Sequence, residues 1–120
     1  MKDLELQEGE EIIDTIKGSY WENTFIFLYE QSVGDIVITN KRLLFNAKVL
    51  ASNFIALDIK ISDIAEIQKC NVGTVVPLNP TGIKLIDHYG NTCKISAVRR
   101  EKVMETLQQL IDKNKDENVR

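Results

Sequence analysis

The side chains that could take part in catalysis or metal binding are few and widely spaced in this 120-residue sequence. There is one histidine, His88, and there are two cysteines, Cys70 and Cys93. A nucleophilic site needs a nucleophile, a base and a group that orients the base, so a single histidine can serve one such site at most. The three residues also lack the short spacing of paired zinc ligands. We therefore expect no enzyme activity, no metal and no cofactor.

The aspartates that could act as general acids or bases are also isolated from one another. Each lies at the edge of a candidate strand or in a turn, where solvated and capping roles outnumber catalytic ones; they are Asp14, Asp58, Asp63 and Asp87.

The two cysteines could form at most one disulfide, which is too few to stabilise a small secreted fold. This favours two thiols in the core of a protein of the reducing cytoplasm. No apolar run approaches the roughly 20 residues of a membrane-spanning helix, and the first residues do not resemble a signal peptide.

The net charge of −3 is unevenly distributed along the chain. Residues 1–35 contain two basic and nine acidic side chains, a balance of −7, whereas residues 36–120 have a balance of +4. Nucleic-acid-binding proteins concentrate lysine and arginine on one face, often together with aromatic side chains that stack on bases. This sequence offers neither in quantity, so we expect no nucleic-acid partner.

The elements that must position any binding site are mostly strands. Branched and aromatic residues alternate in short runs that end at turn-forming residues. The clearest case is 34–45, where Ile36–Ile38 and Leu43–Phe45 flank a polar turn at Asn40. The expected strands are Glu11–Lys17, Thr24–Glu30, Asp35–Thr39, Arg42–Lys48, Phe54–Ile59, Ile64–Cys70, Gly82–Asp87 and Thr92–Ala97.

The apolar period changes after Ala97 from that of strands to that of a helix. Apolar side chains then recur on one helical stripe, which predicts a helix from near Arg99 to near Lys113; they are Val103, Met104, Leu107, Leu110 and Ile111. A series of strands followed by one amphipathic helix predicts a mainly β fold, a curved antiparallel sheet or barrel capped by the helix. We expect one domain over residues 1–120, with a lead-in tail at 1–9 and a charged tail at 114–120.

Several local motifs resemble those of the GRAM domain family, whose members have a pleckstrin-homology-like fold. The resemblance spans Gly9 to Ile111, and its most specific motif is the strand-turn-strand segment at 34–45. The other motifs are Ile61-Ser62-Asp63-Ile64, Val75-Val76-Pro77 before Gly82-Ile83-Lys84-Leu85, and Arg99-Arg100-Glu101-Lys102. The chain departs from the family pattern at Trp21–Gln31, which is longer and more apolar than the usual connection.

The resemblance implies a non-catalytic binding or adaptor module. Protein–protein contact or self-association is the first interpretation, and weak binding to an anionic membrane, such as one with phosphoinositides, is the alternative. The candidate headgroup contacts are Lys41, Arg42 and Lys48. Acidic residues dominate the first strand pair, where related domains often place basic side chains, so we expect weak lipid binding. The location would then be cytoplasmic, or peripheral to the membrane.

The segment Phe25-Ile26-Phe27-Leu28-Tyr29 is a candidate interface. As a strand it would carry apolar side chains on both faces. In a sheet with one solvent-exposed face, apolar and polar side chains would alternate along the strand instead. Its cover could come from a homo-oligomer or protein partner, or from burial inside the monomer, and membrane insertion is disfavoured by Glu22 and Glu30.

Overall fold

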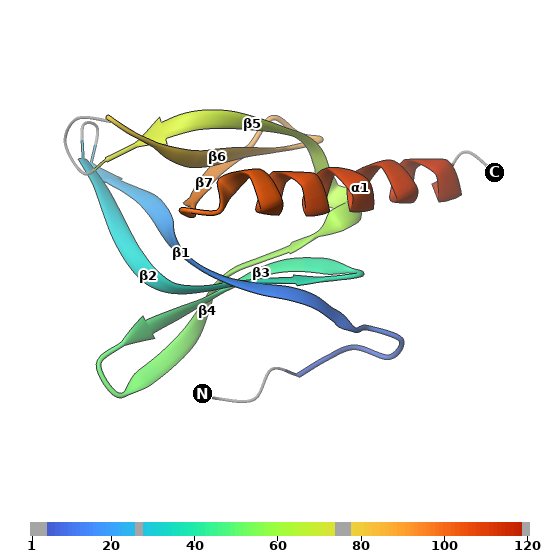
Figure 1. Ribbon diagram of the computed structural model, residues 1–120, viewed down its shortest axis with the longest axis horizontal. Coiled ribbons are helices and arrows are strands. Elements are labelled where there is room, and N and C mark those ends of the chain that lie inside the picture. Colours follow the sequence, from blue (N-terminus) through green and yellow to red (C-terminus); the bar gives the residue numbers. More distant parts are fainter. Residues whose placement is uncertain (1–4, 26–27, 74–77, 119–120) are drawn as a thin grey trace.

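The computed structural model describes residues 5–25, 28–73 and 78–118. They form seven strands, one turn of 3-10 helix and one α-helix (Figure 1). The strands are β1 (Ile12–Phe25), β2 (Leu28–Thr39), β3 (Arg42–Val49), β4 (Ser52–Lys60), β5 (Ile64–Val72), β6 (Asn79–Asp87) and β7 (Thr92–Ser96). The helices are η1 (Ile61–Asp63) and α1 (Arg100–Asn118). Within these residues, no helix has the length and apolar character needed to cross a membrane.

The strands form one antiparallel sheet in the order β4-β3-β2-β1-β7-β6-β5. In Figure 1 the β5–β7 part of the sheet lies on one side of α1 and β3 and β4 lie on the other, with β1 and β2 linking the two parts. Strands β4 and β5 are the two ends of this order, so each has one paired edge and one outer edge. The fold expected from the sequence, a curved antiparallel sheet capped by a C-terminal helix, is confirmed.

Two glycines face each other in the ladder between β1 and β2. Gly18 of β1 pairs with Gly34 of β2. A Cβ atom at Gly18 would lie 2.3 Å from the carbonyl oxygen of Ser96, and one at Gly34 would lie 2.1 Å from that of Asn46. Both distances are far below van der Waals contact, so the backbone can approach its neighbours this closely only without side chains here. The glycine pair therefore permits β1 and β2 to approach the neighbouring backbone of β7 and β3 closely.

The main core lies between the concave face of the sheet and α1. Its strand side chains include Ile36, Phe45 and Leu85, all buried. The helix contributes Val103, Leu107 and Ile111, which are also buried, while Met104 and Leu110 pack against the core at its margin. The five-residue apolar stripe predicted from the sequence is thus confirmed as the packed face of the helix.

The structure departs from the sequence-based expectation most clearly in the first two strands and at the end of the helix. The six expected strands from Asp35 onward correspond to parts of β2 to β7, but the expected strand Thr24–Glu30 is divided between the end of β1 and the start of β2. Long-range pairing with β2 and β7 extends β1 through residues of low strand propensity such as Gly18 and Asn23. The helix also continues beyond Lys113 to Asn118, because solvated turns keep their backbone hydrogen bonds without an apolar stripe.

Candidate functional site

The turn between β2 and β3 anchors the segment that precedes β1. The buried hydroxyl of Thr39 accepts a hydrogen bond from the Arg42 backbone N–H (2.8 Å) and donates one to Glu10 Oε2 (2.6 Å). The Asn40 side chain accepts from the Glu11 N–H (2.7 Å) and donates to the Gly9 carbonyl (3.0 Å). The end of the expected lead-in tail therefore lies against the Thr-Asn-Lys-Arg turn.

Arg42, a candidate headgroup contact, is engaged by this segment. Its Nε and Nη2 donate to the two carboxylate oxygens of Glu10 at 2.8 and 2.7 Å, and its Nη1 donates to Asp58 at 3.0 Å. The Glu10 side chain is fully buried, and the guanidinium holds its pKa at about 2, below the usual 4.5, with help from Thr39 and against the opposing effect of burial. The same pairing raises the pKa of Arg42. Such a bidentate pair leaves Arg42 little capacity for an external anion.

The three candidate headgroup residues do not converge on one place. Lys48 lies near the far end of β3, about 20 Å along the strand from Arg42 at 3.3 Å per residue. There it forms an ion pair with Asp35 at 3.1 Å. Lys41 donates its ammonium hydrogen bond to the carbonyl oxygen of Glu8, a neutral acceptor, so its charge is not compensated by that contact.

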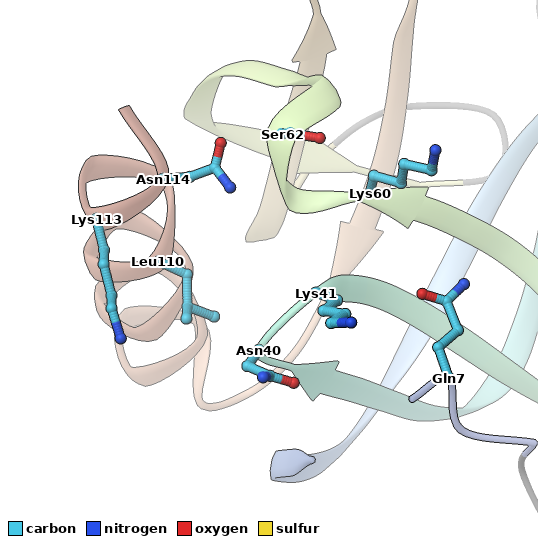
Figure 2. Close-up of a pocket in the computed structure, with 8 residues that line it drawn as sticks. All are labelled: Gln7, Asn40, Lys41, Lys60, Ser62, Leu110, Lys113 and Asn114. Carbon is cyan, nitrogen blue, oxygen red and sulfur yellow. The ribbon is translucent and has the colours of Figure 1, made fainter. Parts of the chain in front are cut away.

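Lys41 is one wall of a pocket of about 410 Å³ at the end of the domain that holds the β2–β3 turn. We call it the lysine pocket, and Figure 2 shows its eight lining residues. They come from the N-terminal segment, the β2–β3 turn, the end of β4, η1 and the second half of α1; they are Gln7, Asn40, Lys41, Lys60, Ser62, Leu110, Lys113 and Asn114. Lys60 and Lys113 are separated from Lys41 by 19 and 72 positions, so only the tertiary fold brings them together.

The electrostatic character of the lysine pocket is positive. Three of the lining side chains are lysines and none is a carboxylate. Within the described residues, Lys60 and Lys113 have no ion-pair partner. In Figure 2 the Lys60 side chain points away from α1 and that of Lys113 runs along the outer side of the helix. The two ammonium groups thus point away from each other, and binding one anion between them would require their flexible side chains to change rotamer.

An exposed apolar region, with side chains on both faces of the strands, lies at the other end of the β3–β4 hairpin. We call it the hairpin tip, and it consists of Val49, Leu50, Phe54 and Ile55, of which Leu50 is fully exposed and the others are 43–51% exposed. Leu50 also has a φ of 55°, in the left-handed region that a leucine occupies at a cost of about 1–2 kcal/mol. Both features are unfavourable for the folded chain.

The remaining candidates have structural surroundings. His88 is exposed in the β6–β7 turn, and Asp87 accepts backbone hydrogen bonds from Tyr89 and Asn91 in the same turn, each at 2.9 Å. Cys70 and Cys93 are free thiols, and burial raises the pKa of Cys93 to about 11, which keeps it protonated and unreactive. Across the residues that the structure describes, no group of three or more His, Cys, Asp or Glu side chains could hold a metal ion.

The candidate interface from Phe25 to Tyr29 spans the junction of β1 and β2. Phe25 pairs with Leu28 across that junction, so the segment is not one continuous strand with two faces. Ile26 and Phe27 lie outside the described residues. Its role in association stays a prediction.

Comparison with known proteins gives a family and a fold. A family model described as the GRAM domain matches residues 1–115. Among solved structures, the C-terminal domain of an unknown protein from Leishmania infantum is similar over 87% of this chain and 86% of its own, with 20% identity and a TM-score of 0.65. The PH domain of Slm1, solved in complex with phosphoserine, is similar over 82% of this chain and 91% of its own, with 14% identity and a TM-score of 0.54. No curated protein matches the sequence.

Proposed function

Because this chain belongs to the GRAM domain family and has the pleckstrin-homology-like fold, we propose that it is a non-catalytic module that binds an anionic, phosphate-bearing group in the lysine pocket. The observation that carries the proposal is the set of three lysines from three separate elements, with no carboxylate among the lining residues. Ser62, which is exposed, adds a hydroxyl group that can hydrogen-bond a phosphate oxygen. Arg42 positions one side of the pocket, since its pairing with Glu10 holds the segment that carries Gln7.

The expected affinity for a single anion is low. Each lysine near an anionic surface contributes about 1 kcal/mol, so three give about 3 kcal/mol, or a preference of roughly 100-fold. This agrees with the weak lipid binding expected from the acidic N-terminal region. The phosphate could belong to a lipid headgroup, which would place the protein at the cytoplasmic membrane surface, or to a soluble phosphorylated molecule. That a domain of the same fold was solved with phosphoserine supports this ligand chemistry.

The test compares a soluble phosphate group with a lipid headgroup as the ligand of the same protein. Inorganic phosphate and phosphoserine are titrated while backbone amide shifts are followed by NMR, and cosedimentation is measured with vesicles of phosphatidylcholine alone or with phosphatidylserine or a phosphoinositide added. We expect shifts at Lys41, Ser62 and Asn114, and anion-dependent cosedimentation only if the source is a headgroup. Lys60→Glu should abolish the response, whereas Lys17→Glu, the same charge change at an exposed site on β1, should leave it intact. Equal responses of the two variants would remove the pocket from consideration.

We also propose protein contact at the hairpin tip as a second function, favoured by the exposure and backbone strain of Leu50. Self-association through this surface predicts a concentration-dependent sedimentation coefficient for the parent protein. Phe54→Lys should remove that dependence, because it places a charge in the apolar hairpin tip. Phe54 is half exposed, so its replacement does not disturb the buried core. A parent that remains monomeric at high micromolar concentration would leave only contact with a different protein for the tip.

A further inference from the structure

The outer edge of β4 adjoins the hairpin tip. Among the described strands, β4 pairs only with β3, so its other edge presents backbone N–H and C=O groups that another extended chain can satisfy. Natural proteins commonly protect such an edge with charged side chains or proline, but residues 49–57 contain neither. In Figure 1 this hairpin projects away from α1. The first half of β4 therefore lacks the usual protection of an outer strand.

Apolar side chains are exposed on both faces of this edge. Phe54 pairs with Ala47, a residue of the main core, so Phe54 points to the concave face of the sheet. Ile55 is the next residue and pairs with Asn46, so it points to the opposite, convex face. Both side chains are about half exposed. A partner that lies against one face can cover only one of them, whereas a strand added at the edge lies beside both.

The exposed residues of β4 determine what the added strand must look like. To bury Phe54 and Ile55 it must be uncharged at this point and must carry adjacent apolar side chains, one for each face. Strand β4 itself has this composition, whereas β5, the other outer strand, carries the exposed charged residues Glu66 and Lys69. A second copy of this chain therefore supplies a matching edge, and a two-fold axis uses the same edge on both copies.

We propose that two copies of this chain pair through β4 in antiparallel orientation, so that one sheet continues across the dimer. This inference rests on the proposed contact at the hairpin tip and assigns its partner. A bulge at Ala56 interrupts the ladder with β3 and confines the regular edge to residues 52–55. With the two-fold axis at Phe54, the two Phe54 rings meet on the concave face, and Ile55 of each copy lies opposite Asn53 of the other on the convex face. The edges that remain are those of β5, so the assembly closes as a dimer.

Sedimentation equilibrium of the full chain measures the dimer dissociation constant for the parent and two variants. Phe54→Lys and Ile55→Lys place a charge on opposite faces of the same edge, and each should weaken dimerisation by about tenfold or more. Both side chains are about half exposed, so circular dichroism should show that the variants fold like the parent. Val98→Lys is the matched control, because Val98 is almost fully exposed between β7 and α1, and it should leave the dissociation constant unchanged.

Two measurements on the parent chain separate strand pairing from other modes of self-association. Hydrogen exchange of the β4 amides that point away from β3 should slow as the protein concentration rises. A mixture of isotope-labelled and unlabelled protein should give intermolecular NOE contacts between Ile55 and Asn53. A parent that stays monomeric at high micromolar concentration would overturn the pairing and leave the hairpin tip for a different protein. A dimer without added protection of β4, or one weakened by only one of the two lysine variants, would keep self-association but overturn pairing through this edge.

Discussion

The buried pair of Glu10 and Arg42 makes a specific prediction about stability. Replacing Glu10 by glutamine keeps the side-chain shape but leaves the guanidinium, which is 11% exposed, with Asp58 as its remaining carboxylate partner. The pKa of Glu10 lies at about 2, compared with 4.5 for the unperturbed group. That difference corresponds to about 3 kcal/mol of stability at neutral pH, similar to the roughly 3–5 kcal/mol lost when one partner of a buried pair is removed.

The sign of the pH dependence follows from the direction of this shift. The folded pKa is lowered, so the unfolded chain takes up the proton first as pH falls. The stabilisation by Glu10 is therefore complete above about pH 4.5 and is lost as pH falls through about 2. Urea unfolding of the parent and of Glu10→Gln should differ by about 3 kcal/mol near pH 7, and the difference should shrink toward zero near pH 2.

Glu11→Gln is the matched control, because Glu11 is the adjacent residue and is exposed. It should unfold within about 0.5 kcal/mol of the parent. A cost below about 1 kcal/mol for Glu10→Gln near pH 7, or a cost that does not change with pH, would refute the assigned role of the pair. The double variant with Arg42→Leu should recover part of the loss, because it removes the buried charge that the single variant leaves under-compensated.

Two other substitutions test the packing of the helix and the strain of the hairpin. Leu107→Asp places a charge in the buried stripe of α1 and should cost several kcal/mol in urea unfolding; a variant that unfolds like the parent would contradict the packing of the helix. Leu50→Asn should stabilise the domain by about 1 kcal/mol, since asparagine tolerates the left-handed φ and the leucine buries no surface in the monomer; a lower urea midpoint would show that the strain argument fails.

The fold could be predicted well where local chemistry and tertiary structure agree. The branched runs around Asn40 are apolar at every residue and are buried on both faces of their strands, whereas the helical stripe through Leu107 is buried on one face of the helix, so both patterns directly reflect burial. The length of β1 could not be predicted in this way, because Gly18 and Asn23 are poor strand formers that are held extended by pairing with β2. The last residue of α1 could not be predicted either, since the last turns of the helix are solvated and carry no apolar period.

The candidate sites were harder to predict than the fold. Lys41 and Arg42 are adjacent and equally basic in the sequence, yet one lines a pocket and the other is paired with a buried carboxylate from 32 positions earlier. Lys60 and Lys113 carried no sequence signal, because single exposed lysines are common and their convergence depends on how η1 and α1 pack. The acidic character of residues 1–35 predicted only weak lipid binding, and it did not identify Glu10 as the partner of Arg42.

The paired glycines of β1 and β2 have a bearing on how this domain can diversify. Gly18 and Gly34 have no space for even a methyl group, whereas Lys60 and Lys113 are both exposed and lie outside the core. Exchanging such surface residues usually changes stability by no more than about 0.5 kcal/mol. The architecture thus separates the positions that determine its shape from those that would determine its ligands. New binding preferences could be selected, or engineered, at the lysine pocket with little cost to folding.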